Sequence, residues 1–342
     1  MPRVAVVGAG SWGTAFSVIP ASNGADTMLW ARREDLAEAI SSRHENPEYL
    51  KGIELPPALT GTHDLEKAVS GADVVVMAIP SHAFRNVFED VVPHLAPESS
   101  VVSLTKGIEQ EGLRRMSEVM REAGDLPDER VAAVSGPNLA KEVARGQPSA
   151  SVVACADEER AERLQGVFMS PTFRVYVNPD MIGVELGGAL KNVVALAAGI
   201  GDGMGFGDNA KASLMTRGLA EIARLGKRMG GNPLTFAGLA GMGDLIATCI
   251  SPLSRNRHVG EELGKGRKLD EIIAEMNMVA EGVKTSRAVV RLADQMGIDA
   301  PIAEHVCRLL DGEMTPQEMV ASLMEREAKP ELHGIEDGAE DG

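Results

Sequence analysis

Aromatic residues are scarce in this sequence, making up only 3% of its 342 residues. Hydrophobic residues nevertheless reach 44%, so aliphatic side chains and 17 methionines must form most of the core. This composition fits an α/β or a helical chain better than an all-β sandwich. The length suits two domains of ordinary size.

Cysteine is scarce as well. Cys155, Cys249 and Cys307 lie far apart and form no CxxC pair. An odd number of cysteines without zinc-ligand or disulfide spacing predicts reduced thiols in a cytoplasmic protein and no metal site.

Positive charge is deficient, because 50 acidic residues outnumber 34 lysines and arginines and give a formal net charge of -16. Such a chain repels nucleic acids and anionic membranes at long range, so we expect neither as a partner. An anionic small molecule would need a local cluster of Lys or Arg.

Long apolar runs are not expected in this sequence either. No stretch approaches the roughly 18 apolar residues of a membrane-spanning helix. The N-terminal run VAVV is cut by Gly8 and is too short for a signal sequence. We therefore expect a soluble, cytoplasmic protein without a membrane span.

Seven apolar runs predict β-strands, at residues 4–7, 27–31, 74–79, 101–104, 131–134, 151–154 and 173–177. Most are separated by helix-length segments such as 34–42 and 112–123. This alternation predicts a Rossmann-type, mostly parallel sheet with helices on both faces, within a dinucleotide-binding domain of residues 1–178. Pro20 is expected to kink the first helix or to end it early.

Long stretches with helical periodicity follow residue 178. They predict helices at residues 183–196, 211–229, 269–276, 283–296, 301–310 and 316–324. We predict an all-α domain over residues 179–330 for substrate binding and catalysis. The glycine-rich run 199–207 is either a plain loop or a mobile lip, and the acidic segment 331–342 predicts a disordered tail.

Gly8, Gly10 and Gly13 form a GxGxxG motif directly after the first predicted strand. These glycines would allow a tight turn, close approach of a pyrophosphate, and close helix-to-strand packing. The following helix would present free N–H groups to the phosphates. The motif alone is a weak signal, but its position after a buried strand predicts binding of a dinucleotide.

The end of the second predicted strand bears on the choice between the two nicotinamide cofactors. Arg32 and Arg33 stand where an acidic residue would otherwise bind the adenosine 2′-hydroxyl. Two guanidiniums suit a 2′-phosphate, so we predict that NADPH is preferred and that NADH can also be used. Alternatively, the two arginines are solvated, and Glu34 or Asp35 binds the ribose of NADH.

Candidate catalytic residues lie in both predicted domains. Lys106 and Gly136 follow the fourth and fifth predicted strands, at the sheet edge where ligands bind. Lys191 lies in a segment nearly free of other charges, where an ammonium needs polar surroundings. Lys191 is therefore the best single candidate for catalysis, and Asn192 lies beside it. Lys106 is either solvated or functional.

Further along the chain, Asp244 lies between apolar stretches and is an eligible partner for Lys191. Ser254, Arg255 and Asn256 offer a hydroxyl, a guanidinium and an amide within three residues. Such a set suits a phosphomonoester, although a Ser-Arg-Asn sequence by itself proves little.

Eight sequence blocks together resemble the bacterial-type NAD(P)-dependent glycerol-3-phosphate dehydrogenases. In order they are GAGSWGTA, TKGIE, SGPNLAKE, GGALKNV, NAKASLMTRGLAE, GMGDLIATC, SRNR and VAEG. The resemblance implies reversible reduction of dihydroxyacetone phosphate to sn-glycerol 3-phosphate, which supplies glycerophospholipid synthesis. A homodimer is expected for such enzymes. Asn138 departs from the family pattern, in which Thr or Ser is common.

The resemblance also implies roles for individual residues. The cofactor would be contacted by Ser11, Trp12, Arg32, Arg33, Lys106, Ala140, Arg255, Val279 and Glu281. The substrate would be contacted by Lys106, Gly136, Asn138, Lys191, Asp244, Ser254, Arg255 and Asn256. Lys191 would transfer the proton, with support from Lys106, Asn192 and Asp244. With an ordinary pKa of about 10.4, Lys191 would be protonated at neutral pH and ready to donate its proton. Oxidation of glycerol 3-phosphate requires the deprotonated amine, so alkaline pH should favour that direction.

Two other functions remain open from the sequence. A β-hydroxyacid or ketopantoate-type dehydrogenase would also have a helical second domain, but it has no obvious use for the Ser-Arg-Asn group. A non-catalytic NADPH-binding protein would not need Lys191, Asp244 and Arg255 together.

Overall fold

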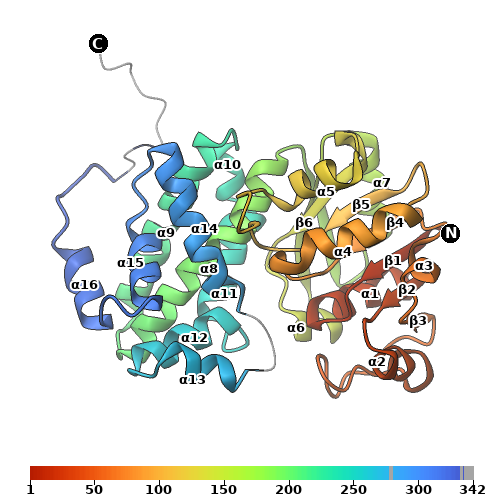
Figure 1. Cartoon of the computed structure of the whole chain (residues 1–342), viewed down its shortest axis with the longest axis horizontal. Helices are drawn as coiled ribbons and strands as arrows, with labels where there is room; N and C mark the ends of the chain where they lie inside the picture. The colour runs from red at the N-terminus through yellow and green to blue at the C-terminus, as the bar shows by residue number, and fades with distance from the viewer. Residues whose placement is uncertain (277–279, 332–333, 335–342) are drawn as a thin grey trace, which may run out of the picture.

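The structure is a computed structural model that describes residues 1–276, 280–331 and 334. Residues 3–178 form a sheet with flanking helices, and a bundle of helices begins at residue 181 (Figure 1). The predicted fold class is therefore confirmed. The predicted tail, residues 331–342, lies almost wholly outside the described residues.

Eight strands form one sheet in the described part of the chain, in the order β3-β2-β1-β4-β5-β6-β7-β8. Every neighbouring pair is parallel except β6–β7, which is antiparallel. The strands are β1 (Arg3–Val7), β2 (Asp26–Trp30), β3 (Leu59–Thr62), β4 (Val74–Met77), β5 (Ser100–Ser103), β6 (Val131–Ser135), β7 (Ser149–Cys155) and β8 (Phe173–Asn178). Sequence analysis missed only β3, an edge strand whose short sequence LTGT has no apolar run.

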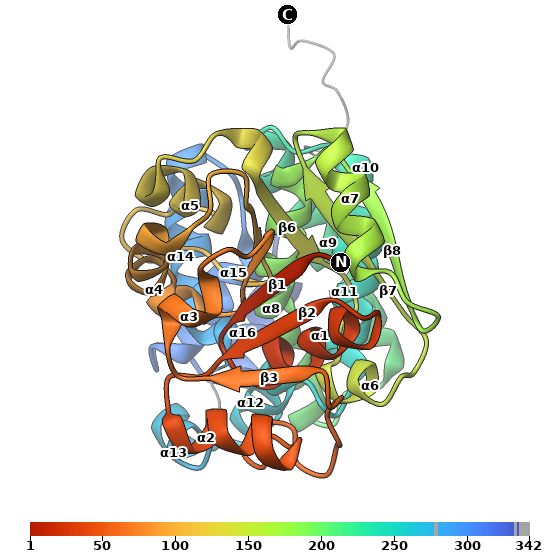
Figure 2. The same cartoon turned by 90° about the vertical axis from the view of Figure 1, so that its right-hand side faces the viewer.

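Each face of the sheet is covered by helices, because side chains along a strand alternate between its two faces. Val4 and Val6 belong to one core, and Ala5 and Val7 to another. The first core includes residues of α1 (Ser11–Ser22), α2 (Glu34–Glu38), α6 (Ala140–Ala144) and α7 (Glu158–Phe168). The second includes α3 (Leu65–Val69), α4 (Phe84–Val91) and α5 (Met116–Gly124), on the opposite side (Figure 2).

Pro20 lies inside α1, in the last turn of the helix. The helix does not stop at the proline but continues to Ser22, after which Asn23 N–H donates to the carbonyl oxygen of Ile19 at 3.1 Å. Because the helix ends two residues later, the missing N–H of Pro20 affects only its final turn.

The described part of the second half contains helices joined by turns and loops, and no strand. Its helices are α8 (Met181–Gly203), α9 (Asp208–Arg228), α10 (Pro233–Phe236), α11 (Asp244–Ile250), α12 (Arg255–Gly264), α13 (Leu269–Ala274), α14 (Glu281–Met296), α15 (Pro301–Leu310) and α16 (Pro316–Met324). The six predicted helices are present, but α10, α11 and α12 were not predicted. Helix α8 also runs seven residues beyond its predicted end.

Glycines bring α8 and α12 into close contact. A Cβ on Gly199 would lie 2.0 Å from the carbonyl oxygen of Arg257, and one on Gly260 would lie 2.0 Å from that of Leu196. A Cβ on Gly203 would lie 2.1 Å from the carbonyl oxygen of Glu261. The interpretation of residues 199–207 as a loop or lip is therefore wrong for its first five residues, where glycine instead allows two helix backbones to meet.

Two segments are long and apolar enough to cross a membrane by length and composition, Met181–Gly203 and Pro233–Ile250. The expectation that no segment reaches this level is therefore wrong. However, 83% of the apolar window in the first segment and 44% in the second are buried inside the protein. The core helix of a globular protein passes the same test.

Candidate active site

The glycine-rich turn joins β1 to α1 and is held by backbone contacts. Gly8 has a φ of +117°, and its N–H donates to the carbonyl oxygen of Trp30 at 3.1 Å. A Cβ on Gly13 would lie 2.0 Å from the carbonyl oxygen of Gly8. A Cβ on Gly10, in contrast, would meet no described atom within 4 Å. Open space above Gly10 and the N-terminus of α1 together fit a dinucleotide pyrophosphate.

A segment that sequence analysis did not single out supports this turn. The buried side chain of Asn46 donates to the carbonyl oxygen of Ala9 and to Thr14 Oγ1, both at 2.9 Å. Ser11 Oγ donates to the carbonyl oxygen of Tyr49 at 2.8 Å. No motif marks Asn46, because its partners lie more than 30 residues away in the sequence.

Two predicted cofactor contacts lie near the same turn. Trp12 Nε1 is buried and has no hydrogen-bond partner among the described residues. Ala140 begins α6 and, like Trp12, packs against the core on this face of the sheet. Val279 lies outside the described residues.

Arg32 and Arg33 follow β2 after one residue, Ala31, and are exposed. Arg33 forms ion pairs with Glu48 (Nη2 to Oε2, 2.5 Å) and Asp35 (Nε to Oδ1, 3.2 Å). Two acidic side chains, Asp35 and Glu48, therefore contact one of the two predicted cofactor-binding arginines. Glu48 was not predicted to lie here.

The structure brings Lys191, Lys106 and Asp244 together. The buried Lys191 Nζ donates to Thr248 Oγ1 at 2.7 Å and lies 3.2 Å from Asp244 Oδ1. Lys106 Nζ donates to Asp244 Oδ2 at 2.6 Å and to the carbonyl oxygen of Gly136 at 2.8 Å. One carboxylate therefore lies between two ammonium groups, one from each half of the molecule. Thr248 was missed, although it follows Asp244 by one helical turn.

Burial lowers the pKa of Lys191 to about 8. The neighbouring Asp244 opposes this shift, and the like charge of Lys106 adds to it. The expectation of an ordinary pKa for Lys191 is therefore wrong, because desolvation disfavours the charged form. An amine with a pKa near 8 can gain or lose a proton close to neutral pH.

Two asparagines connect this cluster to neighbouring elements. Asn192 Nδ2 donates to the carbonyl oxygen of Lys106 at 3.1 Å, and Lys191 Nζ donates to Asn192 Oδ1 at 3.2 Å. Asn256 Nδ2 also donates to Asn192 Oδ1, at 2.9 Å, while Asn256 Oδ1 accepts from Gly282 N–H at 2.9 Å. This network fixes α8, α12 and α14 around Lys191.

The three residues of the Ser-Arg-Asn group have different environments. Ser254 is the N-cap of α12 and accepts a hydrogen bond from Arg257 N–H at 3.2 Å. Asn256 belongs to the network of asparagines. Arg255 is exposed to solvent. Desolvation by the surrounding protein nevertheless lowers the pKa of its guanidinium, and the negative charge of Glu281 opposes this shift. No hydrogen bond engages its guanidinium within the described parts of the chain.

Two buried oxygen atoms near Gly136 lack hydrogen-bond partners among residues 1–276, 280–331 and 334. They are Ser135 Oγ and Asn138 Oδ1. Asn138 Nδ2 donates to Ser151 Oγ at 3.1 Å, so the amide is held on one side only. Both oxygens lie at the carboxyl end of β6, next to the carbonyl group that Lys106 contacts.

Glu281 connects the two halves at the end of β4. Its carboxylate accepts from Ser81 Oγ at 2.6 Å and from Ser81 N–H at 3.3 Å. The predicted cofactor contact Glu281 therefore already has a partner, and Ser81 was not predicted.

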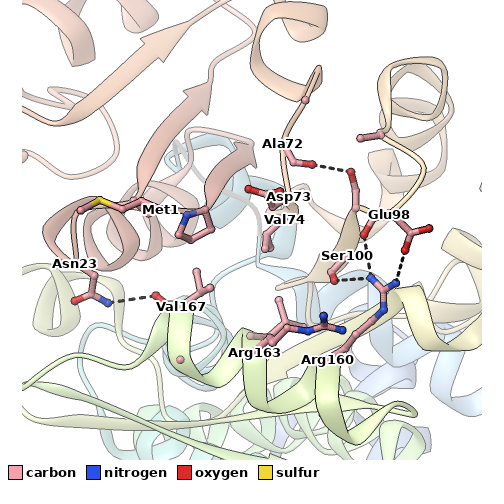
Figure 3. Close-up of a pocket in the computed structure, with 17 residues that line it drawn as sticks. Met1, Asn23, Ala72, Asp73, Val74, Glu98, Ser100, Arg160, Arg163 and Val167 are labelled. Atoms are coloured by element: carbon pink, nitrogen blue, oxygen red, sulfur yellow. Dashed lines mark hydrogen bonds and ion pairs between the residues drawn. The ribbon is translucent and has the colours of Figure 1, made fainter.

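A cavity of about 710 Å³ opens at the other end of the strands (Figure 3). Its lining includes residues just before β1 and at the starts of β4 and β5, whereas the glycine-rich turn follows the end of β1. The guanidinium of Arg160 donates hydrogen bonds to the carboxylate and the carbonyl oxygen of Glu98 and to Ser100 Oγ. This cavity is therefore not the candidate site.

The described residues contain no group of three or more His, Cys, Asp or Glu that could hold a metal ion.

Comparisons with known proteins show the family of the chain. Residues 3–161 match the family model "NAD-dependent glycerol-3-phosphate dehydrogenase N-terminus", and residues 180–321 match the corresponding C-terminus. The chain is 53% identical over 336 residues to the NAD(P)+ glycerol-3-phosphate dehydrogenase of Thermobifida fusca, covering 98% of this chain and 100% of the relative. A second relative, the NAD(P)+ glycerol-3-phosphate dehydrogenase 2 of Sphingopyxis alaskensis, is 53% identical over 331 residues. The match covers 97% of this chain and 98% of the relative.

Solved structures of glycerol-3-phosphate dehydrogenases are also similar to this chain. The crystal structure of glycerol-3-phosphate dehydrogenase from Coxiella burnetii has a TM-score of 0.90 and 37% identity, covering 95% of this chain and 99% of that one. A ketopantoate reductase from Ralstonia eutropha covers 93% of this chain and 99% of its own, with a TM-score of 0.59 and 17% identity. The second likeness shows a shared fold alone. The chain belongs to the NAD-dependent glycerol-3-phosphate dehydrogenase family and is an oxidoreductase that reduces dihydroxyacetone phosphate to glycerol 3-phosphate with NAD(P)H.

Proposed function

We propose that Lys191 is the proton donor of this reaction and that the enzyme prefers NADPH to NADH. The observation that carries the first part is the buried ammonium of Lys191, which Thr248 and Asp244 hold and whose pKa is about 8. In the reductive direction Lys191 Nζ gives a proton to the carbonyl oxygen as negative charge develops there. In the oxidative direction the neutral amine accepts the hydroxyl proton.

Asp244 and Lys106 prepare Lys191 for this role. Asp244 accepts from both ammonium groups, so it orients Lys191 while offsetting part of the cost of burial. Lys106 adds positive charge near the developing oxyanion, which stabilises the transition state. Asn192 fixes the distance between the two lysines, because its side chain contacts the ammonium of one and the backbone of the other.

The substrate phosphate is assigned to Arg255 and Ser254. Arg255 has a guanidinium without a hydrogen-bond partner in the described chain, and the Ser254 hydroxyl keeps its own hydrogen for donation. We also assign Gly136, Asn138 and Asn256 to substrate binding, with Gly136 next to Lys106 and Asn256 acting mainly through Asn192. Binding the phosphate away from the reacting carbon converts binding energy into orientation.

The cofactor is assigned to the carboxyl edge of the sheet. The residues that would hold it are Gly8, Gly10, Ser11, Trp12, Gly13, Arg32, Arg33, Lys106, Ala140, Arg255, Val279 and Glu281. When bound, the reduced nicotinamide supplies a hydride to the ketone carbon. Arg32 and Arg33 support the preference for NADPH, because two guanidiniums after β2 suit a 2′-phosphate.

Parallel assays of dihydroxyacetone phosphate reduction with NADPH and NADH test the cofactor preference. We expect a higher kcat/KM with NADPH and a selective loss of that advantage in Arg32→Ala and Arg33→Ala. A strong preference of the wild-type enzyme for NADH would contradict the proposal and would favour Glu34 or Asp35 as the ribose ligand.

The division of labour between the two halves is part of the same proposal. We assign most of the cofactor binding to residues 1–178 and most of the substrate binding and catalysis to residues 179–330, in a cytoplasmic homodimer. Light scattering on the eluting protein should give twice the mass of one chain, and a monomer would contradict the dimer.

A further inference from the structure

The loop that carries Glu48 is built against the glycine-rich turn. Asn46 Oδ1 accepts from Tyr49 N–H at 2.9 Å, and Leu50 N–H donates to the carbonyl oxygen of Asn46 at 3.1 Å. The same asparagine donates to the turn, and Ser11 contacts the carbonyl group of Tyr49. Glu48 therefore projects from a loop whose neighbouring residues are fixed on both sides.

Glu48 uses this position to contact Arg33. The Oε2 atom of Glu48 accepts from Arg33 Nη2 at 2.5 Å, and Asp35 contacts Nε of the same guanidinium at 3.2 Å. Arg33 therefore has acidic partners on two of its nitrogens. A 2′-phosphate that approached Arg33 would have to share these donors with Glu48 and would meet its negative charge.

We propose that Glu48 is a specificity-determining residue of the cofactor site, which disfavours a 2′-phosphate relative to a free 2′-hydroxyl by occupying Arg33. This inference rests on the proposed placement of the 2′-phosphate at Arg32 and Arg33. Glu48 moderates the NADPH preference that these arginines create, and so keeps NADH usable by the same enzyme.

The expected effect is moderate. About a third of the Glu48 side chain and half of the Arg33 side chain remain exposed, at 32% and 51%. Water and salt therefore screen the interaction, and exposed ion pairs change affinities by factors of roughly two to five. Repulsion of a doubly charged phosphate places the expected change near the upper end, at about fivefold.

The experiment measures Kd values by titration calorimetry on the purified full-length enzyme. NADP+ and NAD+ are compared, together with 2′,5′-ADP and 5′-AMP, two fragments that differ in the 2′-phosphate alone. The variant is Glu48→Gln. The matched control is Glu45→Gln, which removes the same charge from the same loop, since Glu45 pairs with Arg43 instead (2.8 Å).

We expect Glu48→Gln to tighten binding of NADP+ and 2′,5′-ADP by about fivefold at low salt, with much smaller changes for NAD+ and 5′-AMP. Added salt should shrink the difference. Glu45→Gln should leave the ratio of the two Kd values near that of the wild type.

Three results would overturn the proposal. The first is an unchanged ratio of Kd values in Glu48→Gln, and the second is an equal shift in Glu45→Gln. The third is a shift that comes wholly from weaker NAD+ binding, which would make Glu48 a ribose ligand. Arg33→Ala separates this failure from that of the proposed function: if it leaves NADP+ affinity intact, the 2′-phosphate is not bound at Arg33 at all.

Discussion

The two halves of the molecule build their parts of the site from different materials. In the cofactor half, the glycine-rich turn is formed mostly by backbone, with open space above Gly10 and close contact at Gly13. In the helical half, the site consists of buried side chains centred on Lys191, Asp244 and Thr248. Within the catalytic cluster, the carboxylate of Asp244 joins the halves through Lys106.

This difference predicts different consequences of mutation. A backbone-built site depends on the shape of the chain, so added atoms should damage it most. A site of buried charges depends on which groups balance each other, so removing one group should change its chemistry even where the fold survives.

The largest expected effect is that of Lys191→Ala. Loss of the proton donor should lower kcat for dihydroxyacetone phosphate reduction by about a hundredfold or more. The Kd for NADPH should change little, because the cofactor is held mainly by the other half. Lys265→Ala, which removes an exposed lysine from the same half, is the control and should retain full turnover. Full turnover in Lys191→Ala would remove this residue from its role.

Alanine substitutions at two glycines of the same turn should have different effects on stability and on cofactor binding. Gly13→Ala would place a methyl group 2.0 Å from the carbonyl oxygen of Gly8, so we expect a loss of stability of about 1–3 kcal/mol or more. Gly10→Ala meets only open space, so its Tm should stay close to that of the wild type while NADPH binds about tenfold more weakly. Thermal unfolding and cofactor titration distinguish the two. Equal losses of Tm would refute a difference in packing at these positions.

A smaller effect is expected for Arg255→Ala. Charge-assisted hydrogen bonds to phosphate contribute about 1.5–3 kcal/mol, so the KM for dihydroxyacetone phosphate should rise roughly tenfold to a hundredfold. The KM for NADPH should rise less. The same variant should show little change with unphosphorylated dihydroxyacetone, which lacks the group that Arg255 is proposed to bind. A loss of equal size with both substrates would contradict this assignment.

The same contrast explains what could be predicted from the sequence. The GxGxxG motif is local, so its place between β1 and α1 followed from neighbouring residues. Lys191 and Asp244 were chosen because charge is unusual in apolar segments, and the structure brings them within 3.2 Å. The lowered pKa of Lys191 depends on burial and on Lys106, which are properties of the folded chain.

Other features of the fold and the site could not be predicted from the sequence. Asn46 and Glu48 act through residues distant in sequence, and β3 is a short edge strand without an apolar run. The glycines of α8 indicated a loop when read alone. They allow helix packing because α12 lies against them, and that contact is visible only in three dimensions.

The pH dependence of the reaction tests the central claim most directly. Glycerol 3-phosphate oxidation needs the neutral amine of Lys191, whose pKa is lowered to about 8. Oxidation should therefore accelerate as pH rises through 8 and level off about one pH unit above that value. Reduction needs the ammonium and should slow over the same range. We predict a kcat profile with an ionisation near pH 8 in the wild type that disappears from the residual activity of Lys191→Ala. The same ionisation persisting in that variant would contradict the account.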